Sequence, residues 1–130
     1  MPTFYSSPVF HGDKLGRKIT FPTVNLDPSV WPATKEPGVY AAEVNIADLT
    51  FQGALYFGPR IVKNETHNVL EIFLLNFSKE IYGETISFRL HQFIRPVLHF
   101  NSFEELKAQI AKDVTEVEAS FKIKEKTHDT

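Results

Sequence analysis

One acidic residue lies inside the most apolar stretch of the sequence. Glu71 interrupts residues 69–77, which read Val-Leu-Glu-Ile-Phe-Leu-Leu-Asn-Phe. A carboxylate in an apolar, water-poor setting can serve as a general base, although its burial is costly unless it is paired. On spacing alone the commoner outcome is a half-exposed strand with Glu71 in water, because single acids are rarely buried. Glu71 is therefore a candidate general base whose burial the sequence leaves open.

A hydroxyl and an amide lie two residues apart in the segment Pro22-Thr23-Val24-Asn25. Alternate residues of an extended segment share a face, so the side-chain oxygens of Thr23 and Asn25 are expected on one side. Mg²⁺ prefers oxygen ligands, keeps several waters and is often completed by substrate phosphates. The pattern is compatible with such a site. An ordinary turn built on Pro and Asn is the commoner alternative.

A glycine-containing basic loop, residues 11–18, precedes that segment. It contains Gly12 and Gly16 together with Lys14, Arg17 and Lys18. Glycines let backbone N–H groups approach a phosphate, and basic side chains supply charge. The loop lacks the Walker pattern, and taken alone it is better interpreted as a solvated surface loop.

The composition limits the classes of protein to consider. The chain has 130 residues, 42% of them hydrophobic and 23% charged, which predicts one globular domain over 1–130 with its core at about 8–121 and a frayed tail at 122–130. The absence of cysteine excludes disulfides and thiol chemistry. A net charge of −2 argues against a nucleic-acid binder. Without a signal peptide or an apolar run of ~20 residues, we expect a cytoplasmic protein with no membrane contact.

Several strands are needed to position these residues. Apolar patterning predicts strands over 38–46, 50–57, 69–77 and 85–90, and residues 69–77 read as a central strand. Gly58-Pro59 is expected to end the second of them, because proline cannot donate to a ladder.

The last predicted element is an amphipathic helix. Ser102 and Glu105 form a Ser-x-x-Glu capping box. An apolar stripe follows at spacings of three or four, made of Phe103, Leu106, Ile110, Val114, Val117 and Phe121. With the short N-terminal pieces at 8–10 and 21–26, the chain offers five or six strands followed by one such helix. This order predicts a mainly β protein, an antiparallel barrel that is closed or nearly closed. We expect a monomer, because no apolar stripe is left over.

The order of these motifs resembles the riboflavin kinase family. It is similar to the C-terminal kinase half of bacterial bifunctional FAD synthetases and to single-domain eukaryotic flavokinases, over residues 8–120. The resemblance is carried by Gly12…Gly16-Arg17, Phe21-Pro22-Thr23-Val24-Asn25, Gly38-Val39-Tyr40-Ala41, Leu70-Glu71-Ile72-Phe73-Leu74-Leu75-Asn76-Phe77, Ile81-Tyr82-Gly83, Ile94-Arg95-Pro96 and the helical segment from Phe100 to Asp113.

This resemblance implies a six-stranded Greek-key barrel with a C-terminal helix and an ATP-dependent phosphorylation of riboflavin to FMN. Glu71 would take the proton of the ribityl 5′-hydroxyl, and Thr23 and Asn25 would bind Mg²⁺ or another divalent metal. Arg95 would lie near the flavin. The nucleotide would be covered by a loop that includes Gly12, Lys14 and Gly16, with Pro22 and Thr23 at its end.

Several positions depart from the family pattern, and four of them bear on binding or activity. They are Thr20, Tyr56, Asn76 and Val97, where the family usually has Gly, Asn, Asp and an acid. Three interpretations follow: an active riboflavin kinase, a flavin- or nucleotide-binding barrel with weakened turnover, or a non-enzymatic interaction module. The retention of Thr23, Asn25 and Glu71 favours the active kinase.

Overall fold

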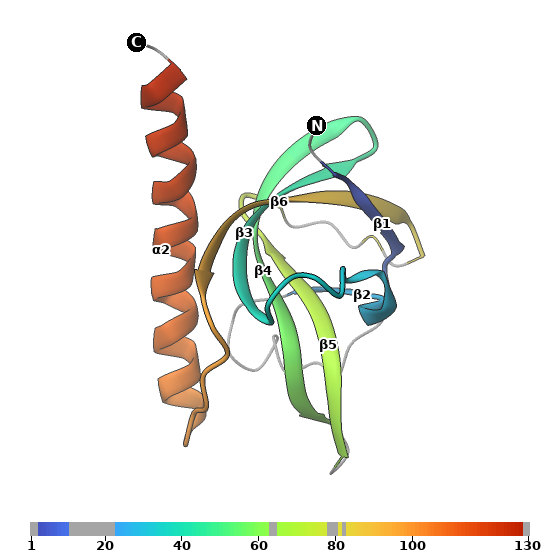
Figure 1. The fold of residues 1–130 in the computed structure, drawn as a ribbon, viewed down its shortest axis with the longest axis vertical. Helices are drawn as coiled ribbons and strands as arrows, with labels where there is room; N and C mark the ends of the chain where they lie inside the picture. Colours follow the sequence, from blue (N-terminus) through green and yellow to red (C-terminus); the bar gives the residue numbers. More distant parts are fainter. Residues whose placement is uncertain (1–2, 11–22, 63–64, 78–80, 82, 129–130) are drawn as a thin grey trace.

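Six strands and one long helix make up the structure. The computed structural model describes residues 3–10, 23–62, 65–77, 81 and 83–128. Its elements are β1 (Tyr5–Pro8), β2 (Val24–Leu26), the 3₁₀ helix η1 (Pro28–Val30), β3 (Gly38–Ile46), β4 (Leu49–Val62), β5 (Glu65–Leu74), β6 (Thr85–Arg95) and α2 (Phe103–His128). The helix stands alongside the curved sheet (Figure 1).

The strands form one antiparallel sheet in the order β1-β6-β3-β4-β5-β2. Because β3, β4 and β5 follow one another and β6 returns beside β3, the topology is a Greek key. The two edge strands meet: the Phe10 N–H donates to the Asn25 carbonyl at 2.8 Å, and the Asp27 N–H donates to the Ser7 hydroxyl at 2.9 Å. These bonds nearly close the sheet into a barrel, so the predicted fold class is confirmed.

The strand bounds differ from the predicted ones mainly in β4. Residues 38–46 form β3 as predicted, and a two-residue turn with positive φ at Ala47 and Asp48 leads into β4. The prediction that Gly58-Pro59 ends the next strand is wrong, since β4 continues to Val62. β3 pairs with β4 only as far as Phe57, so Pro59 lies in a segment that has β5 on one side alone. Proline is tolerated in such an edge segment.

The barrel interior is the main hydrophobic core. Its fully buried side chains include Leu55, Leu70, Ile72, Ile86 and Phe88. Since side chains alternate along a strand, the residues between these positions on β4 and β5 lie on the outer face of the barrel. Tyr56 and Glu71 are on that outer face, directly opposite each other in the register.

A second, smaller core lies between the outer face of the sheet and α2. Val117 and Phe121 of the helix are buried against Ala41 of β3 and Leu75. The Ser102 half of the predicted capping box is confirmed by a 3.2 Å bond from the Glu105 N–H to the Ser102 hydroxyl, whereas the Glu105 carboxylate accepts from the Asn101 N–H at 3.2 Å. The helical backbone continues past Phe121 to His128, into the segment predicted to fray.

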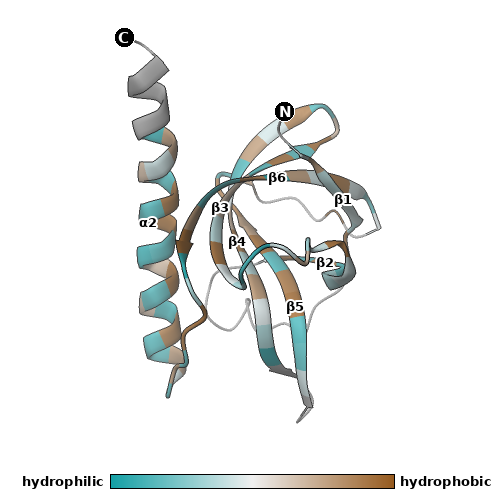
Figure 2. Cartoon of the chain, viewed as in Figure 1, coloured by the Kyte–Doolittle hydropathy of each residue, from teal (hydrophilic) through white to brown (hydrophobic). Residues whose placement is uncertain are grey.

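Polar and apolar residues alternate along α2 in Figure 2, as an amphipathic helix on a sheet requires. Within the described part of the chain, no helix combines the length and apolar character that crossing a bilayer demands.

Candidate active site

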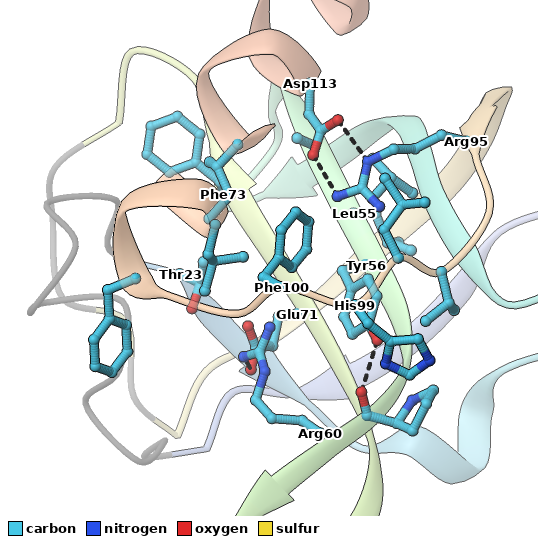
Figure 3. A pocket seen from close by; sticks show the side chains of 18 of the residues that line it. Thr23, Leu55, Tyr56, Arg60, Glu71, Phe73, Arg95, His99, Phe100 and Asp113 are labelled. Carbon is cyan, nitrogen blue, oxygen red and sulfur yellow. Dashed lines mark hydrogen bonds and ion pairs between the residues drawn. The ribbon is translucent and has the colours of Figure 1, made fainter. Parts of the chain in front are cut away.

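A pocket of about 640 Å³ opens between the outer face of the sheet, the β6–α2 connection and the start of α2. Figure 3 shows its labelled side chains, with Glu71 and Arg60 on the sheet and Asp113 on the helix. Apolar and aromatic residues supply most of its wall, and these include Ala54, Leu55, Phe73, Val97, Leu98, Phe100, Phe103, Leu106 and Ile110. Its polar lining includes Thr23, Tyr56, Arg60, Glu71, Arg95, His99 and Asp113.

Glu71 lies in the sheet wall of this pocket. It is 6% exposed, so the alternative in which it faces water is wrong. Strand β5 holds it between two neighbours, with Asn25 of β2 on one side and Tyr56 of β4 on the other. Its carboxylate forms an ion pair with Arg60. Pairing is what allows a carboxylate to be buried at this depth.

Thr23 and Asn25 lie on the side of Glu71 away from β4. Thr23 lines the pocket, and Asn25 is the register partner of Glu71. Directly opposite residues of an antiparallel pair share a face, so the Asn25 amide and the Glu71 carboxylate are on one side of the sheet. The predicted metal residues and the predicted base are therefore neighbours.

The side chains beside Glu71 offer oxygen donors for a divalent cation. No group of three or more His, Asp or Glu side chains that could hold a metal occurs among the residues described. A hydroxyl and an amide beside one carboxylate are all oxygen donors, which suits Mg²⁺ when phosphate and water complete the shell. The residues fit a metal that arrives with a phosphate ligand, and they do not by themselves form a closed metal cage.

Tyr56 lies beneath the Arg60 guanidinium. The guanidinium carbon is 5.4 Å from the centre of the Tyr56 ring, and the Tyr56 hydroxyl donates to the Pro59 carbonyl at 2.7 Å. Burial is the main cause that raises the pKa of Tyr56 above its ordinary value of 10.0; Arg60 opposes this shift and Glu71 adds to it. The hydroxyl is therefore protonated at neutral pH and available as a donor.

Arg95 reaches the pocket from the end of β6, but Asp113 binds its guanidinium. Two bonds of 2.8 Å join Arg95 Nε and Nη2 to the two oxygens of Asp113. Gln109 adds a 3.0 Å bond to the same carboxylate. This pair ties the sheet to α2 across one side of the pocket. The predicted contact of Arg95 with a flavin remains a prediction.

Most of the predicted nucleotide-binding residues lie outside the part of the chain that the structure describes. They are Gly12, Lys14, Gly16 and Pro22, and Thr20 lies in the same segment.

The remaining departures from the family pattern lie in two places. Tyr56 and Val97 line the pocket. Asn76 is exposed in the turn after β5 with a φ of 59°, a conformation that Asn tolerates better than most residues. This substitution is therefore suited to its turn and lies away from the pocket lining.

Two charged residues of the pocket lining were not assigned to the site from sequence. Arg60 is the one charged residue of β4, and Asp113 is a buried acid on the apolar side of α2. For Arg60 the available signal was an isolated charge in an apolar strand, and for Asp113 it was an acid next to the apolar stripe of the helix. Their partners depend on strand register and on helix docking, which the sequence pattern does not supply.

Comparisons with known proteins agree on one family. A family model described as Flavokinase: Riboflavin kinase matches residues 1–121. The bifunctional riboflavin kinase/FMN adenylyltransferase of Listeria monocytogenes is 39% identical over 114 residues, covering 87% of this chain and 36% of that protein. Its counterpart in Haemophilus influenzae is 40% identical over 116 residues, covering 87% and 37%. The chain thus spans just over a third of the length of these curated relatives.

Solved structures share the fold. A crystal structure described as a macrolide-efflux protein from Streptococcus pneumoniae superposes with a TM-score of 0.77 at 27% identity, covering 90% of this chain and 38% of the other. The riboflavin kinase of Trypanosoma brucei has a TM-score of 0.63 at 22% identity, covering 92% and 79%, and shows likeness of fold alone. With the family match spanning the barrel and α2 as far as Phe121, the chain belongs to the riboflavin kinase family.

Proposed function

We propose that this chain transfers the γ-phosphoryl group of ATP to the 5′-hydroxyl of riboflavin, producing FMN and ADP. The observation that carries the proposal is the position of Glu71, a buried carboxylate in the wall of a pocket that Thr23 also lines, with Asn25 as its neighbour in the sheet. Family membership supports the same reaction. The curated relatives are longer proteins, so no activity beyond this domain is proposed.

The pocket suits a flat aromatic substrate with a polar tail. Its volume of about 640 Å³ is in the usual range for small-molecule sites. Phe73, Phe100 and Leu106 offer apolar surface for a ring system, while Glu71 and Thr23 lie at the polar side of the same space. We place the isoalloxazine ring against the apolar wall and the ribityl chain towards Glu71. Arg95 belongs to the flavin side in this arrangement.

The chemical step requires one proton transfer and one phosphoryl transfer. Glu71 accepts the proton of the 5′-hydroxyl as that oxygen bonds to the γ-phosphorus. The bond between this phosphorus and the β–γ bridging oxygen breaks, and ADP leaves with the bond's electron pair. Little covalent work falls to the protein in such reactions, so catalysis rests on positioning and on neutralising charge.

Thr23 and Asn25 are proposed to hold Mg²⁺ together with the ATP phosphates. When bound, the metal supplies positive charge that offsets the phosphate charge during transfer. Thr23 contributes its hydroxyl and Asn25 its amide oxygen, on the face of the sheet that also carries Glu71.

Several finer predictions belong to the same proposal. Gly12, Lys14, Gly16 and Pro22 are assigned to the nucleotide, next to Thr23. We also propose a cytoplasmic monomer that binds neither nucleic acid nor membrane, in keeping with a net charge of −2. Size-exclusion chromatography with light scattering tests the monomer.

The test is FMN formation from riboflavin, ATP and Mg²⁺, followed by chromatography. Glu71→Gln should lower kcat about 100-fold or more, the usual contribution of a general base, while the fold is kept. Glu43→Gln is the matched control, because Glu43 is also a strand acid paired with an arginine, Arg89, and does not line the pocket. Full activity in Glu71→Gln would remove Glu71 from the mechanism.

The same assay separates the other interpretations. Riboflavin or ADP binding without FMN formation would support a barrel with weakened turnover. If neither riboflavin nor ADP binds saturably, the result would support a non-enzymatic interaction module.

A further inference from the structure

Arg60 occupies an unusual position for a strand cation. Its side chain is 21% exposed, and it contacts the Glu71 carboxylate, whose side chain is 8% exposed. The ion pair joins the guanidinium Nη1 to Oε1 of the carboxylate. Figure 3 shows the two head groups together at the polar side of the pocket. Since removal of one partner leaves a buried charge uncompensated, the position of the carboxylate depends on the guanidinium.

Tyr56 restricts where the guanidinium can lie. The ring of Tyr56 is 5.4 Å from the Arg60 guanidinium carbon, a distance at which a cation is attracted to an aromatic face. The Tyr56 hydroxyl bonds the carbonyl of Pro59, the residue before Arg60, at 2.7 Å. One side chain therefore holds both the backbone and the head group of Arg60.

The close approach of Tyr56 to this backbone requires a glycine. A Cβ added to Gly58 would lie 2.8 Å from the Tyr56 hydroxyl and 3.0 Å from a Val97 methyl group. The segment from Tyr56 to Arg60 is thus compact, with Gly58 packed closely against both Tyr56 and Val97.

We propose that Tyr56 and Arg60 act as a clamp that positions the Glu71 carboxylate for proton transfer. This inference rests on the proposed function. Arg60 fixes Oε1, and we assign Oε2 as the atom that receives the proton of the substrate hydroxyl. Tyr56 acts through Arg60, and Arg60 acts through Glu71, so both are positioning residues. The family usually has Asn at the position of Tyr56, so this positioning role would be specific to the present chain.

Three variants test the clamp in the FMN assay. Arg60→Ala should lower kcat by about tenfold to a hundredfold, the effect of misplacing a catalytic group by about 1 Å. The KM for riboflavin should stay within about threefold, since a group that acts on the base does not bind the ring. Arg60→Lys should restore part of kcat, because it returns the charge without the fork geometry. Tyr56→Phe keeps the ring and should lose less kcat than Tyr56→Ala.

Arg89 provides a closely matched control. It too lies in a strand, pairs with a glutamate (Glu43) and contacts an aromatic ring, that of Phe4, at 5.8 Å. The Arg89 side chain is 22% exposed, against 21% for Arg60, but it does not line the pocket. Arg89→Ala should therefore leave kcat within about twofold.

A double-mutant comparison decides whether Arg60 acts through the base. In the Glu71→Gln background, Arg60→Ala should change the residual kcat less than threefold. A loss as large as in the native background would show that Arg60 acts directly on the phosphate or the flavin, and the clamp inference would be overturned. It would also be overturned by a native kcat in Arg60→Ala.

Urea unfolding separates failure of the clamp from failure of the proposed function. Arg60→Ala should lower the unfolding midpoint more when Glu71 is present than in the Glu71→Gln background. If the native protein forms no FMN while this coupling persists, the proposed function is wrong and the pair is only structural. If FMN forms but the coupling and the kcat effect are both missing, the proposed function stands and the clamp is wrong.

Discussion

The ion pair between Arg95 and Asp113 gives the sharpest prediction for stability. In Asp113→Asn the side chain keeps its size, but one bonded oxygen becomes an N–H₂ group that faces another donor. The side chain of Asp113 is 4% exposed and that of Arg95 is 13% exposed, so the arginine is left with a buried and unpaired charge. Removing one partner of a buried pair costs about 3–5 kcal/mol.

The lower end of that range applies here. Arg95 also donates to the Pro96 carbonyl at 3.0 Å, and Gln109 can still bond the new amide. We therefore expect a loss of about 3 kcal/mol in the free energy of unfolding. With a urea m-value of about 2 kcal/mol/M, the unfolding midpoint should fall by about 1.5 M. Circular dichroism at 222 nm would follow the transition through α2.

The control is the more exposed pair between Glu43 and Arg89, whose side chains are 24% and 22% exposed. Surface pairs contribute about 0–1 kcal/mol, so Glu43→Gln should move the midpoint by no more than about 0.5 M. If Asp113→Asn costs no more than Glu43→Gln, the reasoning from burial is refuted. An apolar double replacement, Arg95→Met with Asp113→Leu, should recover much of the loss, because it removes both charges.

Three further predictions concern the site and its supports. Asn25→Ala should raise the Mg²⁺ concentration needed for half-maximal FMN formation, and an unchanged Mg²⁺ titration would reject Asn25 as a ligand. Gly38→Ala should lower the free energy of unfolding by more than about 1 kcal/mol in urea titrations, because Gly38 has a φ of 149° and an added Cβ would collide with the Arg95 carbonyl; a native midpoint would contradict this. The raised pKa of Tyr56 stabilises the folded state below the ordinary tyrosine pKa of 10.0, and this contribution is lost as pH rises through the folded value. Native protein should therefore lose stability faster than Tyr56→Phe above pH 10, and parallel curves would argue against the shift.

Local sequence patterns were sufficient to predict several elements of the fold. The strand at 38–46 and the Ser102 cap follow from alternation and helix capping, which act within a few residues. The predicted end of β4 was wrong because proline disrupts a strand only where a neighbouring strand would accept a hydrogen bond from an N–H at that position. Whether such a strand is present depends on the tertiary structure and cannot be read from the proline itself.

The candidate site was less accessible from sequence. Thr23 and Glu71 were identified by residue type and by resemblance, but the burial of Glu71 depended on a cation eleven residues earlier in the chain, across the β4–β5 pair. The partners of Arg60 and Asp113 become evident only from strand register and from the docking of α2. Positions that are set by long-range pairing are the ones that local patterns do not reach.

The pairing of β1 with β6 bears on the order of folding. Tyr5 lies opposite Phe88, whereas β3, β4 and β5 pair with their neighbours along the chain. Local hairpins form early, because closing a short loop costs less entropy than closing a long one. A chain emerging from the ribosome would therefore expose β1 without its partner until β6 has been synthesised. β2 pairs with β5, which is synthesised before β6, so Asn25 and Glu71 can pair before β1 has its partner. Closure of the barrel through the Phe10–Asn25 bridge is therefore expected late in folding.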